Sequence, residues 1–257
     1  MSIRFLIMSD THDDAFPAPL PPADGILHCG DLTNAGGLAN YQHAIANLVS
    51  LTAELKLVIA GNHDVSLDPK WWAANLNPGR DDPLEPQKAH RLFHVAHGIH
   101  LLDEGTHTFT LADGRSFTDR FGAGAGANFP IPEGVDIVMT HGPPLPISDR
   151  WQLDLGQAGE HCGCPKLWRA IERAKPAMHC FGHIHEGYGV QVMDWDKAAT
   201  RGFGPWAFPG LHEDELEGSL TQTTVFLNAA VMGHGEGDRN APWGFVADFG
   251  ARRQAGS

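Results

Sequence analysis

The chain of 257 residues contains few cysteines and no long apolar run. Its four cysteines are too few for a disulfide scaffold in a protein of this size. Cys162 and Cys164 are separated by one residue, whereas a zinc knuckle uses a two-residue spacer. Because no apolar stretch reaches about 18 residues and no signal-peptide pattern is present, we expect a cytoplasmic protein without a membrane partner.

Basic residues are also scarce. The sequence has 18 Lys and Arg against 31 Asp and Glu, which gives a formal net charge of -13. A protein that grips a long nucleic acid displaces counterions with Lys and Arg, so we expect no long nucleic acid among the partners. No repeat, linker or break in composition divides the chain, and residues 1–257 are predicted to form a single domain. The oligomeric state does not follow from these features.

Five short apolar runs each lead into polar side chains. The runs cover residues 5–8, 26–29, 57–59, 137–140 and 178–181, and their composition is typical of buried strands. Ligands gather at the carboxyl ends of strands in open α/β sheets, so we expect the five following loops to build one polar centre. The residues that these loops supply are Asp10, His12, Asp31, Asn62, His63, Asp64, His141, His183 and His185.

The remaining elements are predicted from periodicity and turn residues. Helices are expected over residues 38–51 and near 165–173, irregular structure with short helices over 65–90, and a flexible loop at 122–126. Further strands are expected near residues 99–102, 107–111 and 115–121, which look antiparallel, and near 223–228 and 244–249. The long loops 145–164 and 194–222 are expected to set substrate specificity, the second of them as a lid or binding loop.

Three further side chains stand outside the expected polar centre. Trp71 and Trp72 are expected to belong to the core or its cover rather than to form a ligand platform. Asn228 ends a predicted strand and is expected to hydrogen-bond to the backbone.

The chemistry of the polar centre favours metal ions. Carboxylates, imidazoles and one carboxamide, without a thiolate, suit manganese, iron or zinc. One structural zinc would use about four ligands and leave the others without a role. Two ions about 3.5–4 Å apart need this larger set and a bridging carboxylate. Asp31 is the best candidate for the bridge, because its loop contains no other ligand. We expect two such ions, with Mn²⁺ first and iron or zinc as alternatives.

These motifs resemble the calcineurin-like metallophosphoesterase superfamily. Its signature pieces stand here, in order, as Asp10-Thr-His12, Gly30-Asp31, Gly61-Asn-His-Asp64, His141-Gly142 and Gly182-His-Ile-His185. Residues 140–145 and 181–189 look like the MPPED-type metallophosphodiesterase branch, which hydrolyses phosphodiesters including cyclic nucleotides. The resemblance implies an α/β fold, namely an α/β/β/α sandwich of two mixed sheets flanked by helices.

The resemblance also implies roles for single residues. Asp10, His12, Asp31 and His185 would hold the first metal, and the second would be held by Asp31, Asn62, His141 and His183. His63 would be the general acid or a phosphate contact, with Asp64 orienting it. The candidate substrate contacts are Asn34, Asn62, His63, His161 and Tyr188.

The predicted reaction is hydrolysis of a small phosphodiester, with 3′,5′- or 2′,3′-cyclic nucleotides as the expected class. Two cations lower the pKa of a water held between them towards about 7, so that it attacks phosphorus as a bridging hydroxide. The segment Gly30–Gly36 lacks the arginine that many related phosphatases use to hold a phosphomonoester, which favours diesters. A phosphomonoesterase or a nuclease on the same centre is the alternative, and a non-catalytic scaffold of the same fold is a third.

Overall fold

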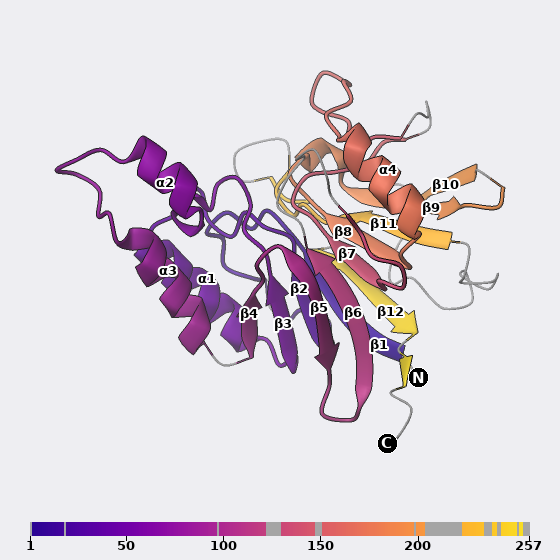
Figure 1. Cartoon of the computed structure of the whole chain (residues 1–257), viewed down its shortest axis with the longest axis horizontal. Coiled ribbons are helices and arrows are strands. Elements are labelled where there is room, and N and C mark those ends of the chain that lie inside the picture. The colour runs from indigo at the N-terminus through magenta and orange to yellow at the C-terminus, as the bar shows by residue number, and fades with distance from the viewer. Residues whose placement is uncertain are drawn as a thin grey trace.

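The computed structural model describes residues 2–17, 19–96, 98–121, 130–146, 151–197, 199–203, 223–233, 238–240, 243–250 and 252–253. Two β-sheets pack face to face in this part of the chain, and helices cover their outer faces (Figure 1). The predicted α/β/β/α sandwich of two mixed sheets is confirmed.

The first sheet has five strands in the order β12-β1-β2-β3-β4. Strands β1 (Ser2–Met8), β2 (Gly25–His28), β3 (Leu55–Val58) and β4 (Ile99–Leu101) run parallel, and β12 (Phe245–Gly250) is antiparallel to β1. The central strands β2 and β3 are buried along their whole length, as their aliphatic composition predicts. Their parallel register brings their carboxyl ends to one edge.

The second sheet has the order β10-β9-β11-β8-β7-β6-β13, and β5 pairs with β6. Strands β6, β7, β8 and β11 run parallel, and the others are antiparallel to their neighbours. The strand bounds are β5 (Gly105–Thr110), β6 (Arg115–Phe121), β7 (Ile137–Met139), β8 (Met178–Phe181), β9 (Gly189–Asp194), β10 (Ala199–Phe203), β11 (Thr223–Asn228) and β13 (Arg252–Arg253).

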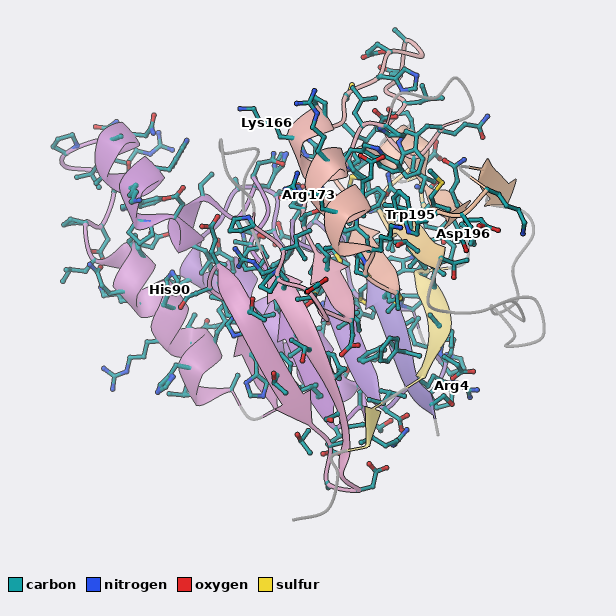
Figure 2. All side chains as sticks on the ribbon, turned by 45° about the vertical axis from the view of Figure 1, so that its right-hand side comes forward. Arg4, His90, Lys166, Arg173, Trp195 and Asp196 are labelled. Carbon is teal, nitrogen blue, oxygen red and sulfur yellow. The ribbon has the colours of Figure 1, made fainter. Side chains whose placement is uncertain are left out.

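Helices α1 (Leu38–Ser50) and α3 (Glu85–Val95) pack on the first sheet, with the short α2 (Pro69–Asn75) beside them. Helix α4 (Pro165–Ala174) covers the second sheet with Leu167, Trp168 and Ile171, while Lys166 and Arg173 stay exposed on its outer side (Figure 2). Single 3-10 turns lie at Val65–Leu67 and His185–Gly187. One apolar core lies between the sheets and one under each helical layer, so the two sheets are fixed relative to each other.

Several local predictions need correction. The strand at 99–101 pairs in parallel with β3 in the first sheet and takes no part in the antiparallel β5–β6 hairpin. The segment 65–90, predicted to be irregular with short helices, does contain the short α2, but its last six residues begin the longer α3. The segment 194–222 was expected to be a loop, but its residues 199–203 form β10, which pairs with β9.

The predicted flexible loop at 122–126 and residues 204–222 lie outside the described residues. Within the described part of the chain, no helix has the length and apolarity needed to cross a membrane.

Candidate metal centre

Two groups of metal-ligating side chains lie at the carboxyl ends of the parallel strands. Asp10, His12 and His185 form one group, which we call the first triad; Asp31, His141 and His183 form the other, the second triad. Within each triad the candidate ligand atoms lie within 4.8 Å of one another. Loops that are far apart in the sequence therefore meet in one centre, as the repeated strand endings predict.

The first triad is closed to solvent around His12, which is only 5% exposed. Its Nε2 lies 3.9 Å from Asp10 Oδ1 and 3.7 Å from Asp31 Oδ2, and His185 Nε2 lies 3.3 Å from Asp10 Oδ1. Neither ring nitrogen of His12 has a hydrogen-bond partner among the described residues. Buried polar atoms are rarely left unpaired, so a cation that takes one of these nitrogens as ligand fits the site.

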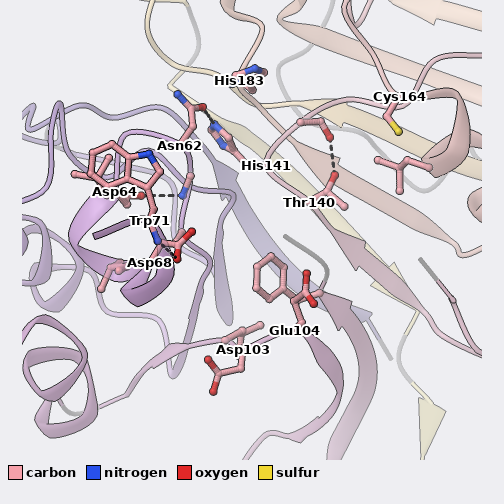
Figure 3. Close-up of a pocket in the computed structure, with 18 of the residues that line it drawn as sticks. Asn62, Asp64, Asp68, Trp71, Asp103, Glu104, Thr140, His141, Cys164 and His183 are labelled. Atoms are coloured by element: carbon pink, nitrogen blue, oxygen red, sulfur yellow. Dashed lines mark hydrogen bonds between the residues drawn. The ribbon is translucent and has the colours of Figure 1, made fainter. Parts of the chain in front are cut away.

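The second triad is centred on His141. Its Nδ1–H donates to the backbone oxygen of Cys29 at 2.9 Å, which orients the ring and leaves Nε2 to face the centre. That Nε2 lies 3.2 Å from Asp31 Oδ2 and 2.9 Å from Asn62 Oδ1. The ring centroids of His141 and His183 lie 4.9 Å apart. Figure 3 shows the side chains of Asn62, His141 and His183 together. Because Asp31 Oδ2 is near both His12 and His141, this carboxylate stands between the triads.

The loops that carry these ligands are strained and tightly packed. Asp10, His12, Asp31 and His183 all have positive φ, between 44° and 71°, which costs non-glycine residues energy and is common at functional sites. Gly182 allows two of these loops to approach each other. A Cβ on Gly182 would lie 2.0 Å from Asp10 Oδ2. The carboxylates of the centre thus leave no room for a side chain at this position.

The electrostatics of the centre favour cations. Burial would raise the pKa of Asp10, but hydrogen bonding from His185 and the charge of His141 outweigh it and hold this pKa well below its usual value. Burial would lower the pKa of His141, but its hydrogen bond with Asp31 and the nearby carboxylates raise it to about 9. The carboxylates are therefore ionised at neutral pH, and a metal ion would replace the proton that His141 carries.

Two fully buried histidines lie behind the ligand loops. His28 Nε2 shares a hydrogen bond with the hydroxyl of Thr11 at 3.0 Å, next to His12. His179 Nε2 does the same with Thr140 at 2.9 Å. Burial lowers their pKa values to about 4 and about 3, so both rings are neutral at pH 7. These rings support the loops and do not act as ligands.

Two asparagines hold the loop of His185 through its backbone. Asn228 Nδ2 donates to the backbone oxygens of Leu153 and Ile184, which confirms the predicted backbone role. Asn240 Nδ2 donates to the backbone oxygen of His185 at 3.1 Å. Sequence reasoning missed Asn240, because it belongs to no motif and follows no apolar run.

His63 lies on the solvent side of the first triad, with its ring centroid 4.9 Å from that of His12. Its Nδ1–H donates to the backbone oxygen of Asn34 at 2.7 Å, and its backbone N–H donates to Asp31 Oδ1 at 2.8 Å. The expectation that Asp64 orients His63 is therefore wrong. The backbone of Asn34 holds the ring, and Nε2 is left for a substrate.

Asp64 has a structural role instead. Its buried carboxylate accepts hydrogen bonds from the backbone N–H groups of Leu32, Thr33 and Gly61, and from the Thr33 hydroxyl. These bonds tie the loop of Asn62 to the loop of Asp31. Burial is the largest cause that raises the pKa of Asp64, to about 6.

The other predicted substrate contacts differ in position. Asn34 is exposed, and its Nδ2 donates to the backbone oxygen of His12 at 2.8 Å. His161 is exposed as well, with Nδ1 2.8 Å from Asp154, which is fully buried. Tyr188 was wrongly predicted: it is 5% exposed and stacks on Phe245 in the core between the sheets, with ring centroids 4.7 Å apart. A substrate cannot reach it there.

A cleft of about 1160 Å³ opens beside the second triad. His141, His183 and Asn62 line it on one side, whereas Asp10 and His12 are not among its described lining residues. The lining also includes Thr140, beside His141, and the segment from Cys162 to Leu167, of which Figure 3 shows Cys164 on the side away from Asn62. The second triad is thus the side of the centre that opens to the cleft.

Known proteins share this arrangement of motifs. The model of the family described as calcineurin-like phosphoesterase matches residues 3–187. The human metallophosphoesterase domain-containing protein 1 is 33% identical over 214 residues, which cover 74% of this chain and 62% of the human protein. A UPF0046 protein of Caenorhabditis elegans is 31% identical over 203 residues, which cover 73% of this chain and 70% of that protein. Both the superfamily and the MPPED-type resemblance of the sequence are confirmed.

Proposed function

Since the chain belongs to the calcineurin-like phosphoesterase family, we propose that it is a hydrolase of phosphoric esters and that it cleaves phosphodiester bonds of small substrates, with 3′,5′- or 2′,3′-cyclic nucleotides as the favoured class. The observation that carries this proposal is the position of Asp31, whose Oδ2 lies 3.7 Å from His12 Nε2 and 3.2 Å from His141 Nε2. One carboxylate between two ligand groups is the arrangement that a pair of cations requires.

The donor set of this centre fits Mn²⁺, with iron or zinc as alternatives. Asp10, His12, Asp31 and His185 would hold the first ion, and Asp31, Asn62, His141 and His183 the second. When bound, such a pair neutralises charge on the phosphate oxygens and supplies a nucleophile at neutral pH.

The residues of the chain then complete the reaction. His63, fixed through Nδ1 by the backbone of Asn34, presents Nε2 to the leaving oxygen and donates a proton to it. Asn62 and His63 contact the phosphate from the loop after β3, and the exposed ring of His161, held by Asp154, contacts the substrate from the opposite loop.

Two features favour small diesters. The segment 30–36 lacks the arginine that would hold a phosphomonoester dianion. The whole chain has a net charge of -13, which disfavours a long nucleic acid and hence a nuclease. A phosphomonoesterase on the same centre is the second candidate. The non-catalytic scaffold is disfavoured, because every proposed ligand and His63 are present.

The test is a substrate comparison with the Mn²⁺-loaded protein. We expect bis-p-nitrophenyl phosphate and cyclic nucleotides to be hydrolysed faster than p-nitrophenyl phosphate, and metal analysis to find about two ions per chain. Activity equal to that of a metal-free control would refute the proposal. Faster turnover of the monoester would establish the second candidate instead.

A further inference from the structure

The cleft is larger than the phosphate chemistry requires. Its volume of about 1160 Å³ exceeds the range of about 300–1,000 Å³ that is typical of small-molecule sites. Asn62, His141 and His183 occupy only one part of its lining. Helix α2 and the residues that follow β4 line another part, so the non-reacting portion of a substrate has a place to bind.

Trp71 is the aromatic side chain that this second part of the cleft exposes. It is 45% exposed, and of the four large apolar side chains recorded as exposed in the described chain it is the one that lines the cleft. The expectation that Trp71 belongs to the core or its cover is therefore wrong. Figure 3 shows its indole ring on the wall that also carries Asn62 and Asp64.

The position of Trp71 is fixed by its helix. Asp68 caps α2, because its Oδ1 accepts hydrogen bonds from the backbone N–H groups of Lys70 and Trp71 at 2.9 and 3.0 Å. The neighbouring Trp72 is used differently: it is half-buried, and its Nε1–H donates to the backbone oxygen of Asp82. Trp72 therefore anchors the helix, and Trp71 lines the cleft.

An exposed indole beside a phosphate site suits one kind of occupant. Aromatic side chains bind nucleobases by stacking. The lining of the cleft also carries the carboxylate of Asp103 and the ammonium groups of Lys70 and Lys166, which suit the hydroxyl, amino and carbonyl groups of a nucleoside. We infer that Trp71 is the platform on which the base of a nucleotide with a single phosphate stacks while its phosphate lies at the second triad. This inference rests on the proposed function.

The test compares two ligands that differ only in the base. Calorimetric titration of the Mn²⁺-loaded protein with AMP and with ribose 5-phosphate should show that AMP binds about tenfold more tightly, which corresponds to about 1.4 kcal/mol. Trp71→Ala should bring the affinity for AMP to that of ribose 5-phosphate, and Trp71→Phe should restore most of the difference. Trp72→Phe is the matched control and should keep the wild-type preference.

Metal content and melting temperature of each variant show whether the fold is intact. Equal binding of AMP and ribose 5-phosphate by the wild-type protein, or a base preference that survives in Trp71→Ala, would overturn the inference. If the base preference depends on Trp71 but no diester is hydrolysed, the proposed reaction fails and the stacking platform is supported.

Discussion

The two triads of the candidate metal centre contain the same ligand types but differ in their surroundings. Each has one aspartate and two histidines. In the first triad His12 is 5% exposed, and neither of its ring nitrogens has a partner in the described chain. In the second triad His183 is exposed, and both histidines line the cleft. Identical ligand chemistry thus produces one enclosed site and one open site.

The difference indicates that the two ions would have different roles. When an ion leaves the enclosed site, buried ligand groups are left without a partner, which costs free energy. An ion in the open site can exchange ligands with solvent or substrate. We therefore expect the first triad to retain its ion and the second to receive the phosphate. Asp31 lies between the two triads, so we expect that the two ions would not bind independently.

The largest effect is expected from Asp31→Asn, which weakens both sites at once. We expect kcat/KM to fall at least a thousandfold and metal content to drop below one ion per chain, measured by diester hydrolysis and elemental analysis. Asp196→Asn, at an exposed position on the second sheet (Figure 2), is the control. If the Asp31 variant kept two ions, the carboxylate would not be shared.

The substitutions His12→Ala and His183→Ala test whether the two triads release their ions at different rates. A chelator should remove the two ions of the wild-type protein in a slow and a fast phase. His12→Ala should abolish the slow phase and His183→Ala the fast one, each with a loss of affinity of about a hundredfold or more at the altered site. Metal release followed with a colorimetric chelator checks this. The reverse assignment of phases would contradict the enclosed character of the first triad.

His63→Ala separates catalysis from metal binding. Because His63 is held by the backbone of Asn34 and contributes no ligand atom to either triad, its removal should leave the metal content unchanged. We expect kcat to fall at least tenfold, because general acid catalysis typically contributes about 10²–10⁴-fold. His94→Ala, on the exposed side of α3, serves as control. An unchanged rate, or loss of metal, would refute the role of His63.

The smallest effect concerns a buried acid whose pKa is raised by burial. Asp119 lies in β6 facing the core between the sheets, and burial raises its pKa to about 8, in contrast to the lowered pKa of Asp10. A raised carboxyl pKa means that the folded state binds more protons than the unfolded state between about pH 4 and pH 8. Stability therefore falls as pH rises, by up to about 1.4 kcal/mol per pH unit from this group.

Asp119→Asn removes that titration and should stabilise the protein at pH 8 more than at pH 5. Chemical denaturation at the two pH values measures the difference. The same gain at both values would show that Asp119 is not protonated in the fold.

The sequence was informative where a single strand ending contained the whole signal. Asp10, His12, Asp31, His141 and His183 were found because each follows an apolar run whose carboxyl end is fixed by local pattern. The sandwich fold was predicted from the same motifs, through the family that they resemble. The pairing of β4 was not, because the three residues from Ile99 to Leu101 fit either sheet until their neighbours are known.

Tertiary structure decided what each side chain faces. Tyr188 follows the last ligand motif, but packing between the sheets buries it against Phe245. Asp64 follows His63 directly, yet its carboxylate turns to the loop of Asp31, because burial requires several backbone donors and that loop supplies them. Trp71 is exposed in the cleft only through the placement of α2. The sequence by itself determined which ligands this protein has, since strand endings are local; burial and contacts across loops, which are not local, decided how they are used.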